Sequence, residues 1–145
     1  MMYSHCATAL IEVTAARAFD FMADPLALGS WSLGCMNVQA VPEQRLYRGT
    51  SMFDGSSTWV EIVAHRETLL IDYRVGSPGN LKPRISARIV PGEVCDLSAS
   101  QCYLSLSAWR SSGMSAARWQ QLCDTHEAEI WLIKSKLENT TAAGM

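Results

Sequence analysis

The sequence predicts an α+β fold, in which a curved antiparallel sheet of about seven strands wraps around one long C-terminal helix. Residues 115–138 repeat apolar side chains at spacings of three and four, which is typical of a helix with one buried face. Between residues 36 and 109, short segments of alternating apolar and polar residues are separated by turn sequences, which indicates strands joined by hairpins. The chain of 145 residues suits a single domain, and we expect residues 1–145 to form it.

The first elements are predicted to be one strand and two short helices. Residues 3–13 alternate in polarity and indicate a strand, although the pattern is uneven. Thr14 can cap the helix that follows, because its hydroxyl can accept from a free backbone N–H of the first turn. Asp24 can cap the second helix, and Pro25 suits its first position, where no backbone donor is needed. This second helix should end near Trp31.

The sheet is expected to consist mainly of later strands with one apolar face and one wetter face. In one of them, Ile71 and Tyr73 oppose Asp72 and Arg74. We expect the charged residues of such wet faces, Arg84 among them, to be solvated and to form cross-strand ion pairs. The predicted strands are residues 36–42, 45–53, 57–65, 68–76, 83–91 and 100–109.

The C-terminal helix is the largest predicted element. At about 1.5 Å per residue it is long enough to cross a small sheet. Because one helix cannot fill all the space inside a strongly curved sheet, we expect a cavity between sheet and helix. The residues of its apolar stripe are Trp119, Leu122, His126, Ile130, Ile133 and Leu137.

Composition and charge exclude several classes of function. The net charge is −2 and there is no basic block, so we expect no nucleic-acid binding. The five cysteines contain no Cys-x-x-Cys pair, which favours reduced thiols in a cytoplasm over a disulfide framework. We see no signal-peptide pattern and no apolar run long enough to span a membrane. The three histidines lie far apart and there is no glycine-rich phosphate loop, so we expect neither a metal nor a cofactor.

Several short motifs occur in an order that resembles the START/birch-pollen-allergen-like (SRPBCC) superfamily, and within it the polyketide cyclase/dehydrase-like branch. Residues 18–25 (AFDFMADP), followed by Trp31, resemble the opening motif of that superfamily. Gly49 before a strand, residues 59–63 (WVEIV) and the Trp-containing final helix extend the resemblance over nearly the whole chain. The resemblance implies a helix-grip fold with a hydrophobic cavity. It implies no single chemistry, because the superfamily includes carriers, receptors and enzymes.

Two residues are candidates for acid–base chemistry in such a cavity. His126 lies in the middle of the helix stripe and could act as a general acid or base, or donate to a ligand carbonyl. It could equally be a partly buried histidine paired with a neighbouring strand. Glu61 shares a strand face with Trp59 and His65; if that face points inward, Glu61 could partner His126. If it points outward, Glu61 is solvated and Val60 fills the core instead.

The candidate ligand-binding residues are His126 and four aromatic residues on separate elements. Aromatic side chains commonly line apolar pockets, although they serve equally well as core. The four are Trp31, Trp59, Tyr73 and Trp119.

Three functions are compatible with these patterns. The first is binding, and by extension transport, of a hydrophobic small molecule such as a lipid or polyketide-like compound in the cavity. The second is a polyketide-type cyclase or dehydratase that uses acid–base groups there. The third is a co-chaperone-like protein-interaction module. Trp131 and Leu132 lie off the helix stripe and leave room for a homodimer.

Overall fold

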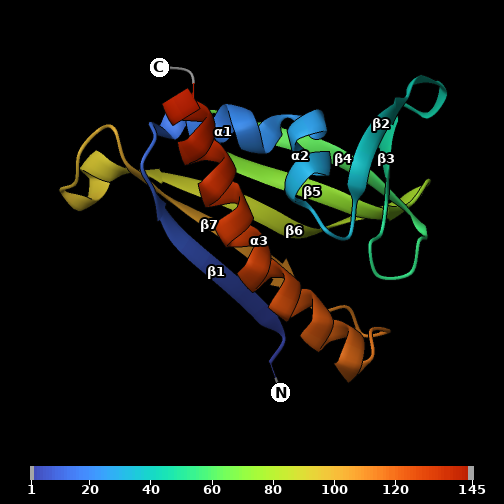
Figure 1. The fold of residues 1–145 in the computed structure, drawn as a ribbon. Coiled ribbons are helices and arrows are strands. Elements are labelled where there is room, and N and C mark those ends of the chain that lie inside the picture. The colour runs from blue at the N-terminus through green and yellow to red at the C-terminus, as the bar shows by residue number, and fades with distance from the viewer. Residues whose placement is uncertain (1, 144–145) are drawn as a thin grey trace.

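The computed structural model describes residues 2–143, with side chains up to residue 139. It contains one seven-stranded antiparallel sheet in the order β1-β7-β6-β5-β4-β3-β2, with one long helix across it and two short helices at one end (Figure 1). The strands are β1 (Ser4–Ile11), β2 (Met36–Val41), β3 (Leu46–Thr50), β4 (Ser57–His65), β5 (Leu70–Ser77), β6 (Asn80–Pro91) and β7 (Cys102–Trp109). The helices are α1 (Ala15–Ala23), α2 (Pro25–Trp31) and α3 (Ala116–Ala143), with short 3-10 turns at Pro42–Gln44 and Gly92–Cys95. The predicted fold class is confirmed.

The caps of α1 and α2 are those that the sequence predicts. The Thr14 hydroxyl accepts from the Arg17 backbone N–H at 3.2 Å, and the Asp24 carboxylate accepts from that of Leu26 at 3.0 Å. The helix α2 lies directly on β2: a Cβ added at Gly29 would stand 2.5 Å from the Val38 backbone nitrogen. Glycine is therefore required where this helix closes the end of the sheet.

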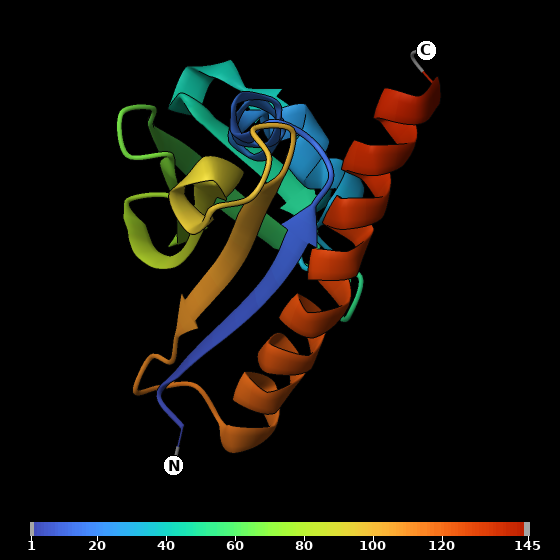
Figure 2. The same cartoon turned by 90° about the vertical axis from the view of Figure 1, so that its left-hand side faces the viewer.

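The helix α3 crosses the inner face of the sheet and follows β1 closely (Figures 1 and 2). Its side chains Ile130, Ile133 and Leu137 are no more than 1% exposed and join the main core. Burying a side chain of this size contributes roughly 1.5–3 kcal/mol relative to leaving it in water. Near the start of α3, Trp119 packs with Ala108 in a separate small cluster.

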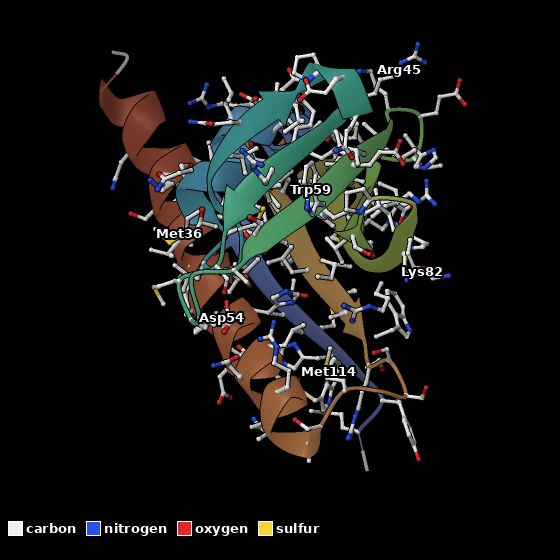
Figure 3. All side chains as sticks on the ribbon, turned by 90° about the vertical axis from the view of Figure 1, so that its right-hand side faces the viewer. Met36, Arg45, Asp54, Trp59, Lys82 and Met114 are labelled. Atoms are coloured by element: carbon white, nitrogen blue, oxygen red, sulfur yellow. The ribbon has the colours of Figure 1, made fainter. Side chains whose placement is uncertain are left out.

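The two faces of β4 differ in what they contact. Val60 is 1% exposed and points to the core, so its neighbours Trp59 and Glu61 lie on the outer face. There Glu61 forms an ion pair with Arg74 across the strands at 2.6 Å, and the Arg48 guanidinium lies 5.5 Å from the centre of the Trp59 ring. Figure 3 shows the side chains of this region, with Trp59 labelled.

The strand β6 contains a bulge. Tyr73 pairs with Ile85 and Val75 with Lys82, so β6 has one residue more than β5 between these pairs. Pro83 lies in this extra stretch, where a missing backbone donor is tolerated. The expectation that Arg84 lies on the solvated face is wrong: strict alternation is lost at the bulge, and Arg84 lines a pocket on the inner side.

Among the described residues, none of the helices has the length and apolar character needed to cross a membrane.

Candidate functional site

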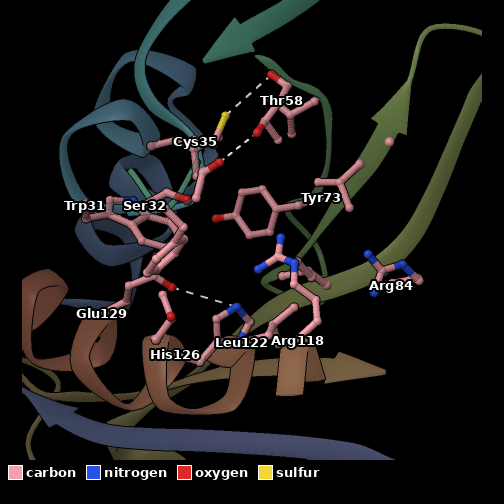
Figure 4. A pocket seen from close by; sticks show the side chains of 18 of the residues that line it. Trp31, Ser32, Cys35, Thr58, Tyr73, Arg84, Arg118, Leu122, His126 and Glu129 are labelled. Carbon is pink, nitrogen blue, oxygen red and sulfur yellow. Dashed lines mark hydrogen bonds and ion pairs between the residues drawn. The ribbon is translucent and has the colours of Figure 1, made fainter. Parts of the chain in front are cut away.

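A pocket lies between the inner face of the sheet and α3, next to α2 (Figure 4). Its cavity volume is about 250 Å³. Much of its wall is apolar or aromatic and comes from helices and strands that are distant in sequence. These side chains include Trp31, Val60, Tyr73, Val75, Ile85 and Leu122.

His126 and Glu129 are two ionisable side chains in the wall of this pocket. They are one helical turn apart on α3, and their side chains are only 8% and 3% exposed. Burial raises the pKa of Glu129 to about 8, even though its carboxylate accepts from the Leu33 backbone N–H at 2.7 Å. Burial, with a smaller contribution from His5, lowers the pKa of His126 to about 4. At neutral pH both groups are therefore uncharged.

The separation of His126 Nε2 from Glu129 Oε1 is 3.8 Å. This is too long for a hydrogen bond, and with both groups neutral it is not an ion pair. His126 also packs edge-on against His5 of β1, with 6.5 Å between ring centres, and its Nδ1 atom has no hydrogen-bond partner among the described residues. The arrangement places an imidazole and a protonated carboxyl group at one pocket wall, where together they can accept and donate a proton.

Tyr73 and Trp31 meet edge-to-face in the pocket wall, with ring centres 6.1 Å apart. The Tyr73 hydroxyl donates to the Met22 carbonyl at 2.6 Å, which ties β5 to the end of α1. Burial, and secondarily the nearby Glu129, raises the pKa of Tyr73. The hydroxyl is thus committed to a structural bond, and the ring is the part of Tyr73 that a ligand meets.

Three of the predicted site residues come together. Trp31, Tyr73 and His126 all line the pocket. Trp119, which is 4% exposed, is buried in the small cluster near Cys123 and is not among the lining residues.

Two predicted site residues lie elsewhere. Trp59 and Glu61 are on the outer face of β4, so the open question about that face is decided against a Glu61–His126 pair. The reason is the inward position of Val60, because neighbouring residues of a strand point to opposite faces.

Sequence reasoning missed Glu129, Arg118 and Arg84, which line the pocket. Glu129 could have been found, because it follows His126 by three positions and so shares its helix face. Pro83 lies inside a predicted strand, which indicates a bulge. The sequence does not show which residue beside the bulge points inward, so it could not place Arg84 in the pocket. No cluster of three His, Cys, Asp or Glu side chains able to hold a metal ion occurs among the residues with described side chains.

The fold has close counterparts among solved structures at low sequence identity. The Zhui aromatase/cyclase from Streptomyces sp. R1128 has a TM-score of 0.68 and 16% identity, covering 97% of this chain and 96% of that one. A START superfamily protein from Mycobacterium smegmatis has a TM-score of 0.66 and 12% identity, covering 96% and 99%. The Aha1 dimer from Colwellia psychrerythraea has a TM-score of 0.64 and 11% identity, covering 94% and 97%.

No protein-family model matches the sequence, and no curated protein matches it. The structural likeness shows that the chain has the same helix-grip fold as these structures. At these identities it establishes the fold and leaves the activity to be argued from the pocket.

Proposed function

We propose that the protein binds a compact, mostly apolar small molecule between the sheet and α3. The observation that carries this proposal is the pocket itself, whose wall joins Trp31, Tyr73 and Val60 from three separate elements. Concave apolar sites with a few polar groups are the usual form of small-molecule sites. Carriage of that molecule to another protein is an extension of the same proposal.

The size of the pocket restricts the ligand. A cavity of about 250 Å³ lies just below the range of roughly 300–1,000 Å³ that is typical of drug-sized ligands. This supports a molecule of one or two rings, or a short branched chain. It argues against a long fatty acyl chain or an extended polycyclic compound as a fully enclosed ligand.

A titration with 2-naphthol tests the binding proposal. Binding should change tryptophan fluorescence, because Trp31 lies in the wall, and should raise the thermal midpoint, because a ligand of the folded state stabilises it by mass action. Trp31→Phe should remove most of the fluorescence change. Trp109→Phe is the matched control, since Trp109 is 49% exposed and is not a lining residue. If 2-naphthol and a panel of similar bicyclic compounds, both neutral and anionic, change neither signal, the proposal is wrong.

A second candidate function is a cyclase or dehydratase, and the His126–Glu129 pair supports it. Dehydration of a β-hydroxy ketone needs a base to remove the α-proton and an acid to protonate the departing hydroxyl. Neutral His126 and protonated Glu129 have these capacities. One structural counterpart is an aromatase/cyclase, which is compatible with this candidate.

Turnover distinguishes the two candidates. The protein would be incubated with 4-hydroxy-4-phenylbutan-2-one, and the unsaturated ketone would be measured by its absorbance. An enzyme should form product faster than buffer does, and Glu129→Gln should abolish the excess while 2-naphthol still binds. Product formation at the buffer rate would leave binding as the supported function.

Homodimer formation through the outer side of α3 is a further part of the proposal. Trp131 is 58% exposed and Leu132 is 38% exposed. Large apolar side chains exposed next to each other are a feature of interfaces. Light scattering after gel filtration should give a dimer mass, and Trp131→Asp should reduce it to that of a monomer. A monomer at high protein concentration would contradict this part.

A further inference from the structure

Two arginines line the pocket from opposite layers of the fold. Arg84 comes from the bulge of β6, and Arg118 comes from the first turns of α3. Arg118 is exposed and Arg84 is partly buried, whereas Trp31 and Glu129 are 3% and 2% exposed. Figure 4 shows Trp31 and Glu129 to the left of the Tyr73 ring, Arg118 below the ring and Arg84 to its right. The pocket therefore has a basic, more open end and an uncharged inner end.

No acidic side chain within 4 Å forms an ion pair with either guanidinium among the residues with described side chains. Arg84 donates to the Trp109 carbonyl at 3.1 Å, and Arg118 donates to the Gln121 amide oxygen at 2.7 Å. Burial, and then the positive charge of Arg118, lowers the pKa of Arg84. The two cations are thus close enough to repel each other, and an anion placed between them would relieve that repulsion.

Neither of the two nearby acids forms an ion pair with these arginines. Asp54 lies in the loop before β4, where its carboxylate accepts from the backbone N–H and the hydroxyl of Ser56; these bonds lower its pKa most, and the positive charge of Arg118 lowers it least. Glu129 lies at the inner end and is protonated at neutral pH. Both guanidinium groups therefore remain available to pair with the anionic group of a bound molecule.

We propose that the ligand of this pocket is an apolar carboxylic acid, whose carboxylate is held by Arg84 and Arg118 and whose apolar body points inward to Tyr73 and Trp31. This inference rests on the proposed binding function and specifies its ligand class. A planar guanidinium matches a carboxylate with two parallel hydrogen bonds, which gives both affinity and orientation. The Trp109 carbonyl and the Gln121 amide oxygen each accept one bond from these arginines, which leaves other guanidinium N–H groups free to donate.

The test compares 2-naphthoic acid with 2-naphthamide, which have nearly the same shape and differ in charge. Affinities would be measured by calorimetry at two salt concentrations. The acid should bind the native protein at least about tenfold more tightly than the amide, because charge-assisted bonds exceed neutral ones. Its advantage should shrink at high salt, because the open end of the pocket is screened by ions.

Two variants and one matched control assign the effect to the arginines. Arg84→Gln and Arg118→Gln should each weaken binding of the acid by about tenfold and that of the amide by less than about twofold. Arg88→Gln should change neither, because Arg88 is exposed on the same strand as Arg84 and is not a lining residue. Unchanged amide binding shows that a variant is folded with its pocket intact.

The failures of the two proposals can be told apart. Equal affinities for acid and amide, unaffected by either arginine variant, would overturn the carboxylate inference and leave binding of apolar molecules in place. Loss of both acid and amide binding in a variant with an unchanged thermal midpoint would also overturn it, because the arginine would then shape the pocket and not recognise charge. Failure of the native protein to bind both compounds would overturn the inference together with the proposed function.

Discussion

The Glu129 carboxylate accepts a hydrogen bond from the Leu33 backbone N–H at 2.7 Å, which joins the middle of α3 to the segment between α2 and β2. Both ends of this bond lie next to the pocket, since Ser32, Gly34 and Glu129 line it. A buried acceptor of this kind holds the segment in place and at the same time presents an ionisable group to whatever occupies the cavity. Its protonation therefore affects stability as well as binding.

Stability should depend on pH through this carboxyl group. Because the pKa of Glu129 rises from 4.5 to about 8 on folding, the folded state retains a proton in this range that the unfolded chain has lost. The free energy of unfolding therefore falls as the pH rises from the unfolded pKa of Glu129 through its folded pKa. Between pH 6.5 and pH 8 the free energy of unfolding should fall by about 2 kcal/mol, measured by urea denaturation. Glu129→Gln should remove this fall, and an identical fall in both proteins would show that another group causes it.

His126 should make the stability of the protein depend on pH in the opposite sense, at lower pH. Its pKa falls from 6.5 to about 4 on folding, so the unfolded chain binds a proton there that the folded protein does not. The contribution of His126 to stability should therefore decline as the pH falls from 6.5 to about 4. Between pH 4.5 and 6.5 Glu129 acts in the opposite sense, so the stability of the native protein should change little there, whereas that of His126→Leu should rise as the pH falls. His126→Leu should abolish the decline attributable to this group and change stability at pH 7 by less than about 1.5 kcal/mol, since a poorly satisfied buried nitrogen is removed. A large loss of stability at pH 7 would instead make His126 an essential core residue.

Two neighbouring residues of α3 should differ sharply in their contribution to stability. Ile133 is fully buried against the sheet and Leu132 is 38% exposed. Ile133→Ala should lower the free energy of unfolding by about 2–5 kcal/mol, because it removes buried methyl groups and leaves a cavity. Leu132→Ala, measured on the monomer, should change it by less than about 0.5 kcal/mol. Similar values for the two variants would contradict the placement of this helix face.

Gly49 should not tolerate a side chain. A Cβ at this position would lie 2.6 Å from the Cys35 sulfur and 2.9 Å from the Met36 carbonyl oxygen. Gly49→Ala should therefore destabilise the protein by roughly 1–3 kcal/mol, because the backbone of β2 or β3 must move. Gly113→Ala is the control, because nothing lies within 4 Å of the added carbon. Equal thermal midpoints for the two variants would argue against this close approach of the strands.

The cysteines should fall into two reactivity classes. Cys6 and Cys95 are exposed and should react within seconds to minutes with a thiol reagent at pH 8, whereas Cys35, Cys102 and Cys123 are buried. Burial raises the pKa of Cys35 and of Cys102 to about 11, so these two should react only slowly until the protein is denatured. Titration in denaturant without reductant should count all five thiols. A count of three would indicate a disulfide.

Sequence reasoning predicted the architecture well because the elements of this fold are strongly periodic. The stripe from Trp119 to Leu137 and the alternation around Tyr73 each contain enough residues for one pattern to outweigh the exceptions. Strand ends were less certain: β6 begins at Asn80, earlier than predicted, because a turn at Gly79, with its positive φ of 82°, pairs Ser77 with Asn80 directly.

The site was harder to predict, because it depends on which way single side chains face. Val63 and Ala64 continue β4 with apolar residues on both faces, so the pattern could not place Glu61. Glu129 is next to the apolar residues of the stripe. An acidic residue is usually predicted to be exposed, so the sequence alone does not show that Glu129 is buried. Its pKa arises from packing by other elements, which no local sequence pattern contains.

The bulge at Pro83 and Arg84 makes the charge of this pocket sensitive to the deletion of a single residue. The contribution of Arg84 to the charge at the mouth depends on one additional residue in β6, while the core side chains Ala87 and Ile89 keep regular pairing with β7 beyond it. A single-codon deletion at position 83 would restore uniform alternation and carry Arg84 to the opposite face without disturbing that core. Selection could thus remove one of the two cations that hold an acid in a single step, with the scaffold left unaltered and Arg118 still in place.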